Sequence, residues 1–283
     1  MSVSIGEALR RASQELDHAG VAEARREAGS LLSHLIGKDR TFIISHADDL
    51  LAEDELESFE NAIARRATGE PLQYITGTQD FFGRAFHVTP DVLIPRPETE
   101  LLVEAALEVV TADSVICDVG TGSGCIAITL LCERAGTRAV AVDVSEAALE
   151  VARENARKLL VYDRVEFVLS DCFAALRGRE ELFDVIVSNP PYVSANALPG
   201  LQREVRDHEP LVALSPGDDG LKVIRRLLHD SPRFLRQNGH LLMEIGFDQG
   251  ETVQQLVDRN VWTLKEIRPD LQGIPRIVLL QKN

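Results

Sequence analysis

Apolar residues recur at helical spacing over the first seventy positions of the chain. The first such run begins after Ser4 and has intervals of four, three and four residues, at Ile5, Leu9, Ala12 and Leu16. Ser4 and Glu7 have the spacing of a capping box, which predicts a helix N-terminus. Three further helices are predicted, with glycine stop signals after two of them, over 22–36, 39–46 and 53–67. This part is therefore predicted to be a small helical bundle, residues 1–71.

The pattern changes over residues 72–95. Apolar and aromatic positions alternate there, and Gly77 and Gly83 interrupt the run. Alternation with a period of two and glycine turns is typical of a short β-hairpin. We therefore predict a β-hairpin connector between the bundle and a third region, residues 96–283.

Strands and helices alternate in that third region. After an amphipathic helix over 98–110, we predict strands over 114–119, 138–144, 164–170, 183–188 and 240–246, with helices over 124–134, 146–159 and 218–236. Alternation of this kind is typical of a parallel sheet covered on both faces. The last two segments, 263–270 and 275–281, are predicted to add an antiparallel pair at the sheet edge. The fold class is α/β with a Rossmann-like sheet.

The first predicted strand runs into a glycine-rich loop, DVGTGSG at 118–124. In open α/β sheets ligands bind at the carboxyl ends of the strands. Glycine permits a tight turn and a close approach of backbone to ligand. We therefore assign cofactor binding to Gly120, Thr121, Gly122, Ser123 and Gly124. Taken alone the loop is ambiguous, because dinucleotide enzymes also use one.

Two further acidic residues end the next strands and favour one class of ligand. Asp143 can accept both hydroxyls of a ribose, and Asp171 can accept an adenine amino group. Together with Asp118, they suit a cationic adenosyl ligand that carries no phosphate. We therefore predict S-adenosylmethionine as the cofactor.

The fourth predicted strand ends in NPPY, residues 189–192. Proline donates no backbone hydrogen bond, so Pro190 and Pro191 must end the strand. The Asn189 side-chain oxygen and the Pro190 carbonyl can accept the two N–H bonds of a planar nitrogen and orient it for methyl transfer. The ring of Tyr192 offers a face for the flat group. We predict that Asn189, Pro190 and Tyr192 are catalytic, with Pro191 also in contact with substrate.

Composition narrows the possible partners. Forty-five acidic and thirty basic residues give a net charge of −15, which disfavours binding to nucleic acid through phosphates. The four cysteines lack the spacing of a zinc or redox motif, and we expect no metal. No run of about eighteen apolar residues and no signal peptide is evident. We therefore expect a cytoplasmic protein with no membrane contact, and a monomer.

Several motifs together resemble one family, the release factor glutamine methyltransferases called PrmC or HemK. The shared segments are PLQYITG at 71–77, FFGRAFHV at 81–88, LIPRPETE at 93–100, DVGTGSG at 118–124, SNPPYV at 188–193, HEP at 208–210 and MEIG at 243–246. The resemblance implies a class I methyltransferase domain at 96–283. It also implies methyl transfer to the side-chain nitrogen (N5) of the glutamine in the Gly-Gly-Gln loop of class 1 release factors, leaving S-adenosylhomocysteine. The bundle would be the domain that binds the release factor.

The resemblance also assigns residues. The glycine loop, Asp143 and Asn189 match the family's cofactor contacts. Cys172 stands where the family often has a large aromatic residue, so what packs on the adenine stays open. Arg96, Glu98 and Thr99 lie in the family signature and are expected at the substrate mouth, although the start of a helix explains them equally well.

Two other functions are open at this point. NPPY is also found in adenine-N6 DNA methyltransferases, which the acidic charge and the lack of a basic recognition region disfavour. A regulatory module that binds an adenosyl ligand without catalysis would leave NPPY unexplained.

Overall fold

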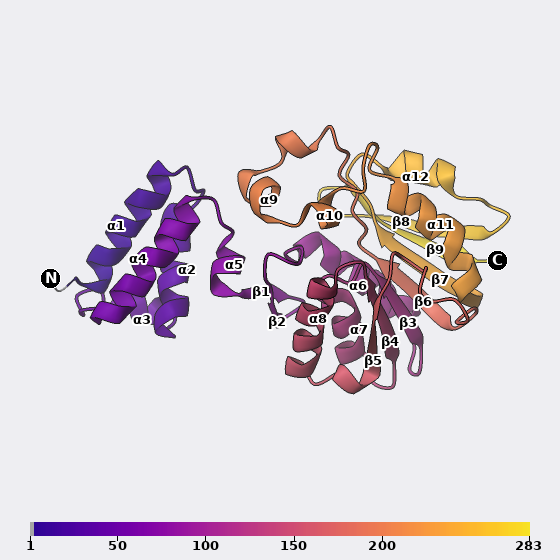
Figure 1. Cartoon of the computed structure of the whole chain (residues 1–283), viewed down its shortest axis with the longest axis horizontal. Helices are drawn as coiled ribbons and strands as arrows, with labels where there is room; N and C mark the ends of the chain where they lie inside the picture. Colours follow the sequence, from indigo (N-terminus) through magenta and orange to yellow (C-terminus); the bar gives the residue numbers. More distant parts are fainter. Residues whose placement is uncertain (1–2) are drawn as a thin grey trace. The chain divides into compact units, whose positions relative to one another are not determined.

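The computed structural model describes residues 3–283, which form two compact units (Figure 1). The smaller unit contains the chain up to Thr78 together with Gln202–His208, and the larger unit contains Gln79–Leu201 and Glu209–Asn283. This division differs from the predicted one in two ways. The β-hairpin groups with the larger unit, and a short segment from the middle of the chain joins the helices of the smaller one.

The smaller unit is helical, as the spacing of apolar residues predicts. Its helices are α1 (Ile5–His18), α2 (Ala24–Ile36), α3 (Arg40–Ser45), α4 (Glu53–Ala67), α5 (Leu72–Thr76) and α9 (Arg203–His208). The core is formed by the predicted apolar faces, and its largest buried members include Leu16, Leu31, Leu32, Phe59 and Ile63. At the start of α1 the Ser4 hydroxyl accepts a hydrogen bond from the backbone of Glu7, while the Glu7 carboxylate pairs with Arg11.

The hairpin prediction was wrong over residues 72–76, which form helix α5. Pro71 sits at the N-terminus of this helix, Tyr74 is buried, and Gly77 ends the helix in a left-handed conformation with φ 69°. An alternation of apolar residues over five positions does not separate a strand from one helical turn. The hairpin itself is shorter, with strands β1 (Thr78–Phe81) and β2 (Arg84–His87).

A buried arginine connects α9 to the other helices of the smaller unit. Only 1% of the Arg66 side chain on α4 is exposed, and it forms ion pairs with Glu27 on α2 and Glu204 on α9. Its Nη1 also donates to the carbonyl oxygen of Glu70 at 3.2 Å. A guanidinium withdrawn from water needs such partners, so this one cation links three helices.

The larger unit is built on a seven-stranded sheet with the order β5-β4-β3-β6-β7-β9-β8. The strands are β3 (Val115–Val119), β4 (Arg138–Asp143), β5 (Val165–Leu169), β6 (Phe183–Ser188), β7 (Leu235–Glu244), β8 (Trp262–Pro269) and β9 (Pro275–Lys282). The first five pair in parallel, and β9 and β8 add an antiparallel pair at the edge, which confirms the predicted sheet. Strand β7 begins at Leu235, earlier than predicted, because Leu235 already pairs with Phe183.

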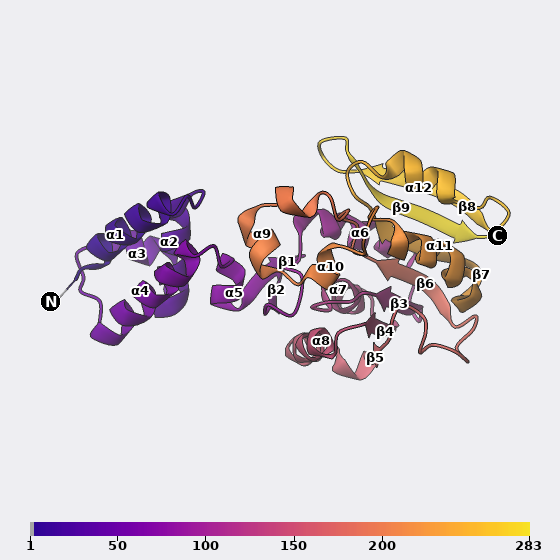
Figure 2. The same cartoon turned by 45° about the horizontal axis from the view of Figure 1, so that its top comes forward.

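Helices cover both faces of the sheet (Figures 1 and 2). One face packs against α6 (Pro97–Val109), α7 (Cys125–Glu133) and α8 (Glu146–Lys158), and the other against α11 (Lys222–Phe234) and α12 (Gly250–Leu256). Neighbouring residues of β3 show the alternation, since Ile116 joins the first core and Cys117 the second. No helix within residues 3–283 has the length and apolar character needed to cross a membrane.

The Arg66 network gives a prediction about stability. Arg66→Met removes the cation and leaves two carboxylates without their partner, so we expect the free energy of unfolding of the helical unit to fall by on the order of 3 kcal/mol. Arg65→Met is the matched control. Arg65 lies on the same helix but is 51% exposed in its pair with Glu70, so its loss should cost less than about 1 kcal/mol. Urea unfolding followed by circular dichroism measures both, and equal losses would contradict the prediction.

Candidate active site

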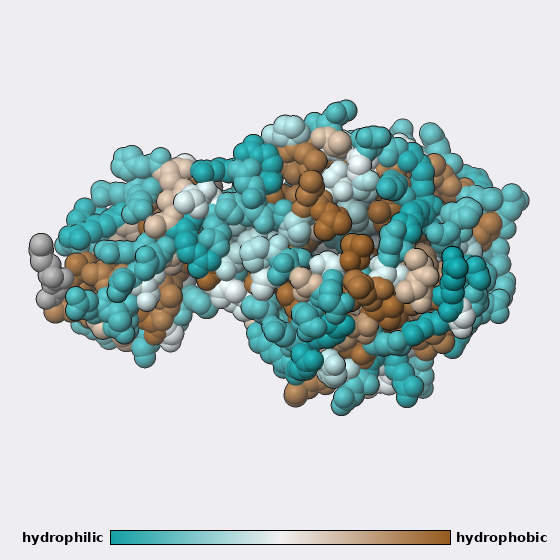
Figure 3. All heavy atoms as spheres, in the orientation of Figure 1, coloured by the Kyte–Doolittle hydropathy of each residue, from teal (hydrophilic) through white to brown (hydrophobic). Residues whose placement is uncertain are grey.

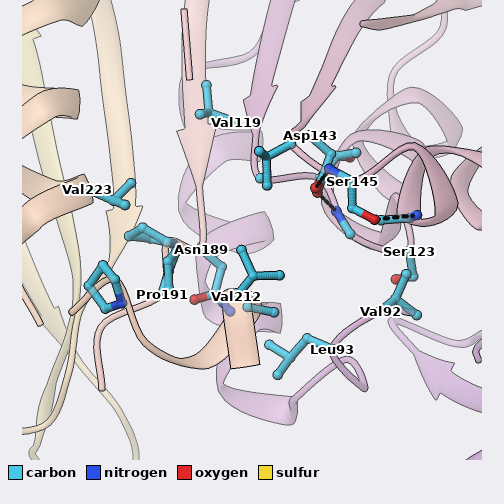
Figure 4. Close-up of a pocket in the computed structure, with 18 of the residues that line it drawn as sticks. Val92, Leu93, Val119, Ser123, Asp143, Ser145, Asn189, Pro191, Val212 and Val223 are labelled. Atoms are coloured by element: carbon cyan, nitrogen blue, oxygen red, sulfur yellow. Dashed lines mark hydrogen bonds between the residues drawn. The ribbon is translucent and has the colours of Figure 1, made fainter. Parts of the chain in front are cut away.

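A cavity of about 400 Å³ opens at the carboxyl ends of β3, β4 and β6 (Figure 4). Asn189 and Pro191 lie on one side of it, Asp143 and Ser145 on the other, and Leu93 and Val212 between them. The surface of the larger unit has apolar side chains over the region of α10 (Leu211–Leu214) (Figure 3), where Leu211 and Val212 are exposed. The cavity therefore has polar groups at its two ends and an apolar wall between them.

The glycine loop forms part of this cavity as predicted. Gly120 and Gly122 line it and have φ values of 77° and 54°, a region that favours glycine. A Cβ added at either position would have no other atom within 4 Å, so the backbone is open to a ligand there. Thr121 and Ser123 also line the cavity, but Gly124 does not. A Cβ at Gly124 would lie 2.6 Å from Ile128 Cδ1, so this glycine permits the start of α7 to pack closely.

Asp118, the acidic residue before the loop, is fully buried. Its Oδ2 accepts hydrogen bonds from Thr121 Oγ1 at 2.7 Å and from the backbone N–H of Ala127 at 3.2 Å. Its Oδ1 has no hydrogen-bond partner among residues 3–283. Burial raises the pKa of Asp118 to about 7. This carboxyl group therefore holds the loop and retains acceptor capacity.

Asp143 connects the glycine loop to the start of α8. Its Oδ2 accepts from the backbone N–H of Gly122 and its Oδ1 from that of Ser145, both at 2.9 Å (Figure 4). Burial raises the pKa of Asp143, and these hydrogen bonds partly oppose that rise. Each carboxylate oxygen has a second lone pair, so the side chain can still accept two hydroxyl donors from the cavity.

Asp171 and Cys172 line the cavity beyond β5. The Asp171 side chain is 65% exposed and forms an ion pair with Arg226 of α11 at 2.6 Å, and Arg226 Nη2 also donates to the Asp171 carbonyl oxygen. Cys172 is buried with φ 49°, and burial raises the pKa of its thiol to about 11, so the thiol is neutral. Arg226 is a cavity residue that the sequence pattern does not indicate.

Asn189, Pro190 and Pro191 line the cavity at the end of β6. The preceding residue, Ser188, is buried and donates from its hydroxyl to the Val119 carbonyl oxygen at 2.6 Å, which ties the ends of β6 and β3 together. Asn189 Nδ2 donates to Thr99 Oγ1 on α6 at 3.0 Å. The side-chain amide therefore presents its nitrogen to Thr99, and its oxygen is available to the cavity.

Tyr192 has a different environment from the rest of NPPY. It is absent from the cavity wall, and its hydroxyl donates to Glu244 Oε1 at the end of β7 at 3.1 Å. The neighbouring Glu244 Oε2 accepts from Thr99 Oγ1 at 2.7 Å. Burial and the Glu244 carboxylate raise the pKa of Tyr192, so its hydroxyl stays protonated.

Of the three residues expected at the substrate mouth, Arg96 and Thr99 line the cavity and Glu98 does not. Arg96 lines the cavity and forms an ion pair with Glu209, whose side chain is buried. Glu209 also accepts from the backbone N–H of Ile94 at 3.4 Å. Glu98 is exposed in the first turn of α6 and is absent from the cavity wall. The HEP motif is the sequence signal for Glu209, although from sequence alone a loop turn before Pro210 is the better explanation of this motif.

Residues 3–283 contain no group of three or more His, Cys, Asp or Glu side chains arranged to hold a metal ion. The polar groups around the cavity include carboxylates, a carboxamide, Ser and Thr hydroxyls and backbone groups, which can form hydrogen bonds with the hydroxyl and amino groups of an organic ligand.

Comparison with known proteins places this geometry in a family. The family model of the PrmC N-terminal domain matches residues 7–77, and that of the methyltransferase small domain matches residues 97–203. The release factor glutamine methyltransferase of Cereibacter sphaeroides is 46% identical over 272 residues, 96% of each chain. The chain belongs to the release factor glutamine methyltransferase family. The enzyme of that name from Nitratidesulfovibrio vulgaris is 44% identical over 278 residues, 97% of this chain and 94% of its own.

A solved structure supports the fold. A methyltransferase from Pyrococcus furiosus superimposes with a TM-score of 0.53 at 17% identity, covering 79% of this chain and 99% of its own. At that identity the likeness concerns the class I methyltransferase fold alone, as the sequence predicts.

Two residues that no sequence signal indicated, Gln249 and Gly220, contact the backbone at Tyr192, the last residue of NPPY. Gln249 is buried, and its Nε2 donates to the Tyr192 carbonyl oxygen at 3.1 Å and to that of Gly220 at 3.4 Å. Its Oε1 accepts from the backbone N–H of Gly246 at 2.9 Å. Gly220 has φ 73°, and a Cβ added there would lie 2.2 Å from the Tyr192 carbonyl oxygen.

Gly220→Ala should therefore displace the backbone at Tyr192. We expect a loss of stability on the order of 3 kcal/mol, because left-handed strain and a backbone clash act together. Gly178→Ala is the matched control, since Gly178 has φ 85° but no atom within 4 Å of an added Cβ, and it should lose about 1 kcal/mol. Thermal unfolding compares the two variants, and equal losses would show that the Tyr192 contact is relieved without cost.

Proposed function

We propose that the protein transfers a methyl group from S-adenosylmethionine to the side-chain amide nitrogen of the glutamine in the Gly-Gly-Gln loop of class 1 peptide release factors. The observation that carries this proposal is the orientation of Asn189, whose Nδ2 is bound to Thr99 Oγ1 at the edge of the cavity. Its oxygen can then accept a hydrogen bond from an amide N–H. The family membership supports the same acceptor.

The cavity suits S-adenosylmethionine in its size and in its hydrogen-bonding groups. Asp143 can bind the ribose hydroxyls, and Asp171 and the loop at Cys172 can bind the adenine. The glycine loop lets the backbone come close to the ligand. Both arginines that line the cavity are already paired, Arg96 with Glu209 and Arg226 with Asp171. The cofactor supplies a methyl carbon bonded to a sulfonium sulfur. We propose that no metal takes part.

The protein's own task is to position a planar amide. Its nitrogen lone pair is delocalised, so the group must be held with the nitrogen directed at the methyl carbon. The Asn189 Oδ1 and the Pro190 carbonyl oxygen can accept its two N–H bonds and favour the positive charge that develops on nitrogen. Once the nitrogen carries the methyl group it becomes acidic, and its proton can leave to water. No general base is required.

We further propose that the helical unit binds the release factor and that the protein acts as a cytoplasmic monomer without binding DNA. The match of residues 7–77 to the PrmC N-terminal domain supports the first of these roles. The net charge of −15 is consistent with a protein substrate in preference to a polyanion.

Incubation with methyl-labelled S-adenosylmethionine tests the proposal. An intact class 1 release factor, its variant with the loop glutamine changed to asparagine, and duplex DNA would be offered in parallel. We expect label on the intact factor alone. Label on DNA would replace the proposal with adenine methylation, and label on neither would leave only cofactor binding.

Asn189→Ala separates the amide pocket from the cofactor site. Loss of one acceptor that acts in the transition state should lower kcat by on the order of a hundredfold, or about 3 kcal/mol. Cofactor affinity should fall only modestly. Asp143→Ala is the contrasting variant, with a large loss of cofactor affinity expected by isothermal titration calorimetry. An unchanged rate for Asn189→Ala would remove Asn189 from the pocket.

A further inference from the structure

A chain of three hydrogen bonds runs from the cavity into the core of the larger unit. Asn189 Nδ2 donates to Thr99 Oγ1 at 3.0 Å, Thr99 Oγ1 donates to Glu244 Oε2 at 2.7 Å, and Tyr192 OH donates to Glu244 Oε1 at 3.1 Å. We infer that Thr99 and Glu244 are positioning residues, which fix the Asn189 carboxamide with its oxygen toward the substrate amide. The inference rests on the proposed function and adds the residues that orient its acceptor.

The direction of the hydrogen bonds follows from chemistry. An ionised carboxylate can only accept, so the single proton of the Thr99 hydroxyl must point to Glu244. The oxygen of Thr99 can then only accept from Asn189. The group of Asn189 that lies next to Thr99 must therefore be the amino nitrogen, and Oδ1 takes the opposite arm of the amide. An asparagine flipped by 180° would present a donor to the substrate N–H bonds and repel them.

Burial makes this arrangement specific. Thr99 and Glu244 are 2% and 1% exposed, so water does not compete for their hydrogen bonds. The partners come from three separate elements of the larger unit, with Thr99 on α6, Glu244 at the end of β7, and Asn189 and Tyr192 after β6. A satisfied buried network of this kind holds one rotamer of each member. The carboxamide is thus oriented before substrate arrives.

The charge state of Glu244 controls the direction in which the Thr99 hydroxyl donates its hydrogen bond. Burial raises its pKa to about 7, while the hydrogen bonds from Thr99 and Tyr192 favour the ionised form. The titratable and charged groups that face it are Tyr192, Glu98 on α6, Cys125 on α7 and Arg276 on β9. Arg276 favours ionisation of Glu244, and Glu98 opposes it. A protonated Glu244 could donate to Thr99, and the hydroxyl of Thr99 would then be free to bind Asn189 Oδ1.

A pH dependence follows, with a definite sign. Above about pH 7 Glu244 is ionised and the amide oxygen faces the substrate, so kcat should fall as the pH drops through about 7. Stability should change in the opposite sense. The pKa of the folded state lies above the usual 4.5, so protonation at lower pH favours the folded protein. A loss of turnover on acidification would therefore not be loss of fold. Asp118 also has a pKa of about 7, so variants of the network itself must separate the two carboxyl groups.

Four variants test the inference at saturating S-adenosylmethionine. Thr99→Val keeps the shape and removes the hydroxyl, and it should lower kcat about tenfold with an unchanged KM for the cofactor. Thr99→Ser should restore kcat to within about twofold of the wild type. Glu244→Gln should lower kcat and abolish its fall near pH 7. Thr129→Val is the matched control, because the hydroxyl of Thr129 is buried on α7 without a hydrogen-bond partner among residues 3–283, and it should behave as the wild type.

A measurement without turnover separates this inference from the proposed function. In a carbon-13 titration of the Glu244 carboxyl group, assigned with Glu244→Gln, the Thr99→Val variant should have a raised pKa because one hydrogen bond to the ionised form is lost. The side-chain amide protons of Asn189 should also exchange faster with water in that variant. A raised pKa and faster exchange support the inference even if the wild type methylates no release factor. Wild-type kcat in Thr99→Val, or an unchanged Glu244 pKa, would overturn it.

Discussion

A buried carboxylate needs hydrogen-bond donors, and the need of Glu244 for them organises the functional edge of the sheet. Its donors are side chains from two other parts of the chain, Thr99 at the start of α6 and Tyr192 after β6. Satisfying one buried charge therefore fixes the end of β7, the first turn of α6 and the NPPY segment relative to each other. The geometry of Asn189 is a consequence of that requirement, because Asn189 binds the same threonine.

Much of the fold could be predicted because two patterns extend over long stretches of the chain. Apolar residues recur at helical spacing over the first seventy positions, and strands alternate with helices after residue 98. Strands β3, β4, β5 and β6 begin and end within about one residue of their predicted bounds, and β7 is longer than predicted because it begins at Leu235. The antiparallel edge follows from two strands joined by a short turn. Three short helices, α9, α10 and α12, were missed. Such short helices depend on tertiary contacts more than on their own sequence, so periodicity gives them little signal. The helix α5 was assigned to a hairpin for the same reason.

The residues of the candidate site also differ in how far the sequence could predict them. Residues that follow a strand directly, such as Asp143 and Asn189, could be placed from topology, since parallel strands end at one edge of the sheet. Residues that act through a partner distant in sequence could not. Glu209 reaches Arg96 across 113 positions and Gln249 reaches Tyr192 across 57, and neither distance is encoded in a local pattern. Tyr192 shows the limit most clearly, because the motif locates its backbone but does not determine the direction of its ring.

The chain passes between the two compact units three times, after Thr78, after Leu201 and after His208. The helical unit is thus assembled from two separate stretches of the chain. A shortened protein that began near residue 79 would still carry α9, but without Arg66, the buried cation that neutralises Glu204. A deletion designed to isolate the larger unit must therefore also remove or replace residues 202–208, which belong to the helical unit.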